Sequence, residues 1–250
     1  MDKKENKFGL WLFGFGLAYA FFQIFPALLI KPFIGPVYWG DVLDFLTPFA
    51  VIFLVYFLYR RIIKLSPKPN PKYQPREIFF KVVLAVGFIL YVNGHGVHLS
   101  ANAISRFIEN SGMKETEIFN AAYLFDEIIS HFMWDTGVIF ISLGLILGAI
   151  SLPVISMDKK NTVFLLWGAA FYGFTFTVNG IEGQVVPLMF PAAVLGFFLC
   201  LGLFIKEKKK SLLNPVHLFF LAGYLVSTVL FSYWGIAHAG FPEFSALGWI

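Results

Sequence analysis

The sequence predicts an all-α integral membrane protein, a bundle of about seven transmembrane helices, and three observations support this prediction. Only 14% of the 250 residues are charged and 58% are hydrophobic, whereas a soluble domain carries roughly 25% charge. Seven apolar stretches come near the length of about 20 residues that a helix needs to cross a bilayer. Lysine and arginine gather in alternate connections between these stretches, as the positive-inside rule requires.

The expected spans follow one another with short connections, and prolines punctuate the first two connections. We expect one polytopic membrane domain over residues 1–250, without a separate soluble domain. A helical prelude is expected over 116–133, because that segment contains no proline. The third span either continues past residue 98 or breaks at Gly94 and Gly96, since glycine weakens a helix. The predicted spans are 8–30, 42–63, 77–98, 134–155, 162–181, 185–205 and 214–236.

The basic residues also predict an orientation. If the N-terminus is cytoplasmic, 16 of the 19 lysines and arginines lie inside, and the segment after the last span carries none. We therefore predict a multi-pass protein of the cell membrane with its N-terminus in the cytoplasm and its C-terminus outside. The net charge of +4 needs no nucleic-acid partner, because this pattern and attraction to anionic membrane lipid explain it. The inside set is Lys3, Lys4, Lys7, Arg60, Arg61, Lys64, Lys68, Lys72, Arg76, Lys81, Lys159, Lys160, Lys206, Lys208, Lys209 and Lys210.

Histidines and carboxylates gather at the predicted outer ends of the spans. Four of the five histidines lie there, whereas His217 lies at the inner start of the last span. Asp41 and Asp44 open the second span, and Glu182 follows the fifth. Because ionisable residues at membrane depth are costly and mark functional sites, this gathering predicts a site at the outer boundary.

The spacing of these residues predicts two polar helical faces, since residues three or four apart share a face of a helix. The two sets are His95, His98 and Asn102, at i, i+3 and i+7, and Glu127, His131 and Asp135, at i, i+4 and i+8. Facing helices of this kind build metal sites in helix bundles, and imidazole with carboxylate suits zinc or iron. The single cysteine, Cys200, excludes a cysteine-rich metal site.

These residue types favour a membrane-embedded metalloenzyme that hydrolyses a lipid or another apolar small molecule with metal-activated water. Zinc is the favoured divalent metal and iron is the alternative, because catalytic zinc takes three protein ligands and keeps one open position. The expected metal ligands are His95, His98, His131 and His238. Asp135 and Glu127 are the expected catalytic carboxylates, and the substrate-orienting residues are Asn102, Ser100, Glu182 and Asp44. The sequence leaves the oligomeric state open.

Other hypotheses use the same residues. Iron or copper at this site would support an oxidase or hydroxylase, whereas outer-boundary carboxylates without a metal suit a transporter, a sensor or a structural subunit of a membrane complex. Histidines at a membrane boundary also occur simply as interfacial residues. A rhodopsin is excluded because 214–236 contains no lysine to hold retinal. The residue types are those that alkaline ceramidase-type hydrolases place around zinc, but the spacing of that family's motifs is absent, so no family is assigned.

Overall fold

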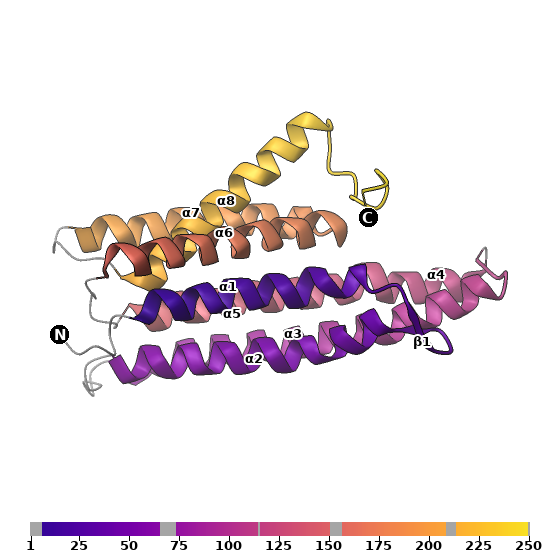
Figure 1. Ribbon diagram of the computed structural model, residues 1–250, viewed down its shortest axis with the longest axis horizontal. Coiled ribbons are helices and arrows are strands. Elements are labelled where there is room, and N and C mark those ends of the chain that lie inside the picture. The colour runs from indigo at the N-terminus through magenta and orange to yellow at the C-terminus, as the bar shows by residue number, and fades with distance from the viewer. Residues whose placement is uncertain (1–6, 66–73, 115, 151–156, 209–213, 250) are drawn as a thin grey trace.

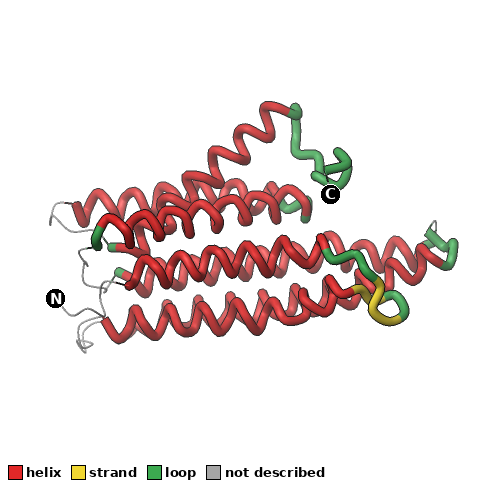
Figure 2. Tube along the Cα trace, viewed as in Figure 1, coloured by secondary structure: helices red, strands yellow, loops and turns green. Residues whose placement is uncertain are grey.

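The computed structural model describes residues 7–65, 74–114, 116–150, 157–208 and 214–249. Within these residues seven helices are long and apolar enough to cross a membrane, which confirms the predicted all-α, multi-pass membrane bundle. Figure 2 shows helix almost everywhere, with strand only in a short hairpin near one end. The described residues do not include the basic residues Lys3, Lys4, Lys68, Lys72, Lys209 and Lys210, or residues 151–155 of the predicted fourth span.

The helices run alternately up and down the bundle (Figure 1). The only strands in the described ranges, β1 and β2, form an antiparallel hairpin between the first two spans. The elements in chain order are α1 (Phe8–Ile24), the 3₁₀-helix η2 (Phe25–Leu28), β1 (Pro32–Ile34), β2 (Val37–Tyr38), α2 (Trp39–Leu65), α3 (Gln74–Asn110), α4 (Glu117–Tyr123), the π-helix η4 (Leu124–Ser130), α5 (His131–Ala149), α6 (Lys159–Glu182), α7 (Val186–Lys208) and α8 (Pro215–Ala237). The most extensive packing joins α3 with α5, α1 with α6, and α8 with α6 and α7.

The third span is much longer than the membrane requires. Helix α3 has 37 residues and passes through Gly94 and Gly96 without a break. At 1.5 Å per residue it is about 55 Å long, against a hydrocarbon core of about 30 Å. The expected prelude before the fourth span is also helical, as α4 and η4. Together α3 and α4 extend beyond the ends of α1 and α6 (Figure 1).

Small residues allow a very close contact between α1 and α6. A Cβ placed on Gly16 of α1 would overlap the carbonyl group of Gly168 on α6, with its carbon only 2.7 Å away. Transmembrane helices associate through such small residues, because van der Waals packing replaces the hydrophobic effect in lipid. Helix α1 is thereby held against α6 rather than only against its sequence neighbour α2.

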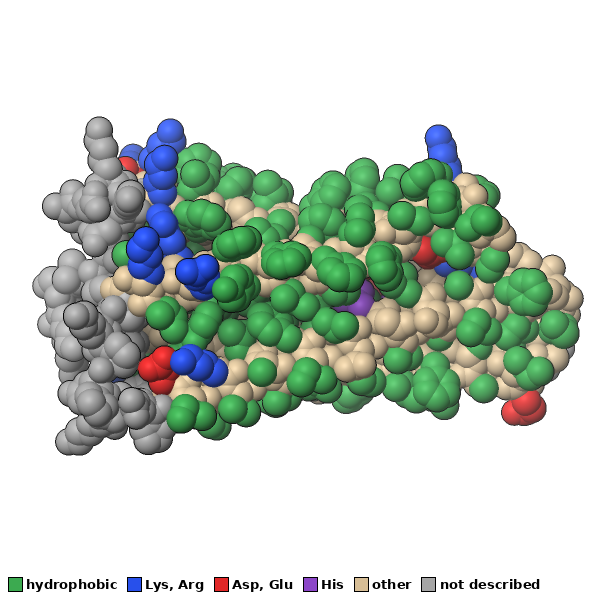
Figure 3. Space-filling model, turned by 90° about the horizontal axis from the view of Figure 1, so that it is seen from below, with side chains coloured by type: hydrophobic (Ala, Val, Ile, Leu, Met, Phe, Trp, Pro, Cys, Tyr) green, Lys and Arg blue, Asp and Glu red, His purple; other side chains and the backbone are tan. Residues whose placement is uncertain are grey.

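The outer surface suits lipid along most of its length. Large apolar side chains such as Phe53, Phe79, Ile89 and Leu195 are each about 60–70% exposed and would be unfavourable in water. Figure 3 shows apolar side chains along the face in view and lysine and arginine gathered at one end. This basic end is where α1 begins and α2 ends.

Candidate functional site

The histidines and carboxylates come together on α3, η4 and α5, at the level where α1 and α6 end. Gly94 makes this approach possible, because a Cβ there would lie 2.6 Å from the Cα of Trp134 on α5. The backbones of α3 and α5 therefore touch one turn away from His98. The glycine predicted to weaken α3 instead packs this helix against its partner.

Three histidines have a carboxylate near an imidazole nitrogen, and two of these histidines lie close together. The Nδ1 atom of His98 lies 2.9 Å from Oδ1 of Asp126, and Nε2 of His131 lies 3.9 Å from Oε2 of Glu127. The two imidazole ring centroids are 5.0 Å apart. The structure thus brings together His98 and His131 from the two predicted faces, together with Glu127.

His95 is buried in the bundle and is separated from His131. Its side chain is fully buried, 3.6 Å from Oδ1 of Asp44, and its ring is tilted against Trp134 at a centroid distance of 3.9 Å. The indole of Trp134 also stacks on His131 at 5.3 Å. The ring of Trp134 therefore lies between His95 and His131, and the predicted set of four histidine ligands is divided.

Two neighbouring cavities open beside His98. The larger has a volume of about 510 Å³ and the smaller about 290 Å³. Both are lined by Gln23, Ala27, His98 and Trp134. The larger one adds His131 and the carboxylates Glu127, Glu182 and Glu243 to apolar walls that include Phe174, Val178 and Trp249. The smaller one adds Asp41, Asp44, Asn102 and Arg106.

A polar network connects the walls of the larger cavity. Gln23 of α1 donates to the hydroxyl of Tyr91 at 2.6 Å and accepts from the side-chain amide of Asn179 at 2.9 Å. These three residues come from α1, α3 and α6. They hold the three helices together around the cavity and leave amide groups on its wall.

The segment after α8 folds back over the larger cavity. In this C-terminal strap, Gly240–Trp249, the amide of Phe244 donates to Oε2 of Glu182 at 2.8 Å. Gln184 donates to the carbonyl of Phe241, and Trp234 donates to the carbonyl of Pro242 at 3.0 Å. Glu182 therefore anchors the strap as well as lining the cavity.

Replacing Glu182 by glutamine is expected to loosen the strap and expose the cavity. A hydrogen bond to a charged group contributes about 1.5–3 kcal/mol, so maleimide labelling of a Val178→Cys probe should rise about tenfold. Cys200 is fully buried and gives little background. Glu243→Gln is the matched control, because the side chain of Glu243 accepts a hydrogen bond from Ser245, which itself belongs to the strap. Equal labelling in both variants would show that Glu182 does not hold the strap.

Other predicted site residues lie elsewhere. Asp135 is 1% exposed and lines neither cavity. Ser100 donates to the carbonyl of Gly96 and lines a separate groove on the outer face of α3 and α4. His238 follows α8 and lies against Trp234 at a centroid distance of 4.2 Å. The structure thus does not bring these three residues to His98 and His131.

The sequence did not single out Asp126, Trp134, Gln23 or Asn179 as members of the site. Asp126 is hidden by the π-helix, whose i→i+5 turns rotate residues 124–130 away from ordinary helical phase. No pattern in the sequence signals this rotation. The sequence could have indicated Gln23 and Asn179, because both lie inside predicted spans, where polar residues are costly and mark functional sites.

The site falls short of a complete metal centre in its present arrangement. Among the residues that the structure describes, no group of three or more histidine, cysteine or carboxylate side chains is placed to hold a metal ion. The imidazoles of His98 and His131 lie side by side on the wall of the larger cavity. Comparison with protein-family models, curated proteins and solved structures found no match.

Proposed function

We propose that this chain is a membrane-embedded enzyme that hydrolyses a lipid or another apolar substrate in the larger cavity, with a divalent metal ion, preferably zinc, on His98 and His131. The observation that carries the proposal is the pair of imidazoles 5.0 Å apart. Both imidazoles line a partly apolar cavity, and each has a carboxylate partner. Hydrolysis of a lipid needs polar catalytic groups beside walls that accept acyl chains, and this cavity offers both.

The residues fit a metal ion in part. Two imidazoles bound to one tetrahedral zinc, with Zn–N distances of about 2.0–2.1 Å, have ring centroids roughly 5 Å apart, as His98 and His131 do. Asp126 contacts Nδ1 of His98, which leaves Nε2 for a metal in the usual carboxylate–histidine pattern. A third ligand would come from Glu127 or Glu182, because both carboxylates line the same cavity.

A bound ion would supply Lewis acidity and an activated water molecule. The chain itself supplies the other functions. Glu127 lies 3.9 Å from His131, where its carboxylate can accept a proton from water. The amides of Gln23 and Asn179 can orient a polar headgroup, and Phe174, Val178 and Trp249 form walls for an acyl chain. The C-terminal strap limits the access of bulk water.

The same proposal includes the orientation. The described lysines and arginines gather mainly at the end of the bundle where α1 begins and α2 ends (Figure 3), and the positive-inside rule places that end in the cytoplasm. The N-terminus is then cytoplasmic, the C-terminus lies outside, and the cavity opens at the outer side of the cell membrane. This arrangement gives the site water from outside and substrate from the bilayer.

Elemental analysis of detergent-purified protein tests the metal. About one equivalent of zinc is expected in the wild type and a loss of at least tenfold in His98→Ala/His131→Ala, because both nitrogen ligands are removed. His238→Ala is the matched control and should retain the metal. Iron in place of zinc would support oxygen-dependent chemistry at the same residues. No metal in the wild type, even after reconstitution with zinc or iron, would contradict the enzyme proposal and favour a transporter or structural subunit.

A further inference from the structure

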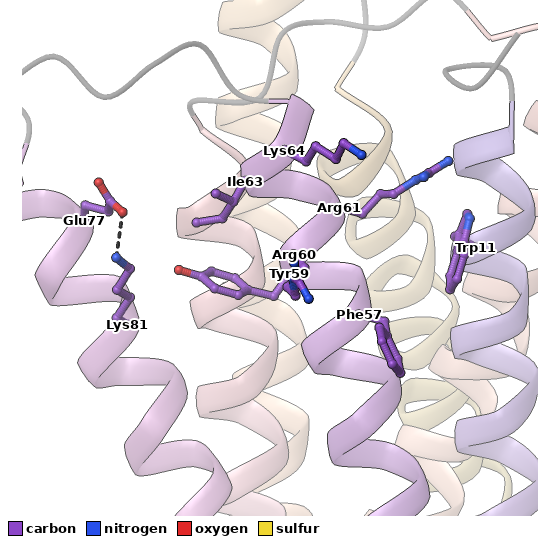
Figure 4. A pocket seen from close by; sticks show the side chains of 9 residues that line it. All are labelled: Trp11, Phe57, Tyr59, Arg60, Arg61, Ile63, Lys64, Glu77 and Lys81. Atoms are coloured by element: carbon purple, nitrogen blue, oxygen red, sulfur yellow. Dashed lines mark hydrogen bonds and ion pairs between the residues drawn. The ribbon is translucent and has the colours of Figure 1, made fainter.

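Another cavity, of about 600 Å³, lies at the opposite, basic end of the bundle (Figure 4). It is formed where α1 begins, α2 ends and α3 begins, so it lies at a membrane boundary. Its walls combine basic and apolar side chains: Trp11, Phe57, Tyr59, Arg60, Arg61, Ile63, Lys64, Glu77 and Lys81.

The charge of this cavity is strongly positive. Among the described residues, four cationic side chains line it, and one carboxylate, Glu77, pairs with Lys81 at 2.6 Å. Arg60, Arg61 and Lys64 place the other three cations on the last two turns of α2. Figure 4 shows Arg61 and Lys64 extending from α2 toward the side on which Trp11 of α1 stands.

The apolar part of the cavity lies next to these cations. The side chains of Trp11 and Phe57 are 41% and 51% exposed, and both lie on membrane-spanning segments. The guanidinium carbon of Arg61 lies 5.6 Å from the centre of the Trp11 ring, a cation–π distance. This contact fixes the cation at the edge of the apolar surface, where a lipid phosphate meets its acyl chains.

We propose that this cavity binds the phosphate group of an anionic phospholipid through Arg61 and Lys64, with an acyl chain lying along Phe57 and Trp11. Guanidinium and ammonium groups are the usual protein ligands of phosphate. The exposed apolar wall favours a lipid over a free anion, because a free phosphate would leave Trp11 and Phe57 uncovered. The site is independent of the catalytic proposal, since it uses residues at the other end of the bundle.

Native mass spectrometry of the full chain with added phosphatidylglycerol tests the proposal. Arg61→Gln/Lys64→Gln is expected to bind phosphatidylglycerol about 30-fold more weakly, because each of the two basic side chains contributes about 1 kcal/mol toward anionic lipid. Lys159→Gln/Lys160→Gln is the matched control, since these two exposed lysines begin α6 at the same end and lie outside the lining of this cavity. An equal loss in both double variants would overturn the proposal and leave a general attraction between charges.

Two further experiments distinguish a phospholipid from free phosphate and exclude misfolding as the cause of weaker binding. Phosphatidylcholine should bind much more weakly, and inorganic phosphate at the same concentration should fail to displace phosphatidylglycerol; displacement would indicate a free-anion site instead. In vesicles, phosphatidylglycerol with brominated acyl chains should quench wild-type tryptophan fluorescence more than that of Trp11→Phe. This variant keeps both cations and an aromatic ring. Equal quenching in the two proteins would place the acyl chain elsewhere and contradict the proposal.

Discussion

Replacing Gly94 by alanine is expected to destabilise the protein by about 1–3 kcal/mol or more, because overpacking a closely packed interface has this cost. The new Cβ would collide with the backbone of Trp134, 2.6 Å away at Cα. A backbone atom cannot rotate out of the way as a side chain can, so α3 and α5 must separate. Since His98 and His131 stand on these two helices, their separation should also increase.

Gly96→Ala is the matched control for this effect. It lies two residues along the same helix, and in the described part of the structure no atom of another helix lies within 4 Å of the position of an added Cβ. Alanine there should be neutral or stabilising by up to about 1 kcal/mol, because it favours the helix more than glycine does. Thermal unfolding in one detergent measures both variants. Equal melting temperatures for Gly94→Ala and Gly96→Ala would show that the contact between α3 and α5 is more tolerant than its geometry indicates.

Replacing Asp126 by asparagine is expected to weaken metal binding 10- to 100-fold, the usual effect of removing a carboxylate that orients a histidine ligand. Asp126 contacts Nδ1 of His98 at 2.9 Å and is 4% exposed. Asparagine keeps the size of the side chain but loses the negative charge beside Nδ1 of His98. The measurement is a zinc titration of metal-stripped protein by isothermal calorimetry.

Glu117→Gln serves as control for the loss of one negative charge, because this exposed residue lies in the same helical segment, away from the histidines. Its zinc affinity should equal that of the wild type. Asp126→Glu should recover part of the affinity, since it restores the charge, whereas a purely structural role would not respond to charge. Wild-type affinity in Asp126→Asn would remove Asp126 from the site and weaken the assignment of His98 as a ligand.

The membrane fold could be predicted because each span shows its hydropathy over about 20 consecutive residues. A stretch such as α7, with Ala192–Leu203 uncharged, has no alternative to a helix in lipid. The convergence of His98, His131 and Glu127 was also predictable, because each lies near the end of a span and helical spacing fixes its face. Asp135 was predicted to share their face, but it is 1% exposed and lines neither cavity beside His98.

Other parts of the site depend on features that no periodic pattern carries. The π-helix η4 brings Asp126 to His98, and its extra residue per turn leaves no mark in composition. The C-terminal strap depends on three isolated hydrogen bonds to backbone groups, at Glu182, Gln184 and Trp234. Gly94 could be read equally as a helix breaker or as a packing residue, and only the neighbouring helix α5 decides between them.

The unequal lengths of the helices have a consequence for the surrounding lipid. Helix α3 has 37 residues and α6 has 24, which correspond to about 55 and 36 Å. The projecting part of α3 and α4 still presents apolar side chains outward, with Ile104, Phe107 and Ile118 more than half exposed. The apolar surface that faces lipid is therefore longer along α3 and α4 than along α6. A bilayer of constant thickness cannot match both sides, so hydrophobic mismatch thickens or tilts the lipid at the step beside the larger cavity, where a lipid substrate would leave the membrane.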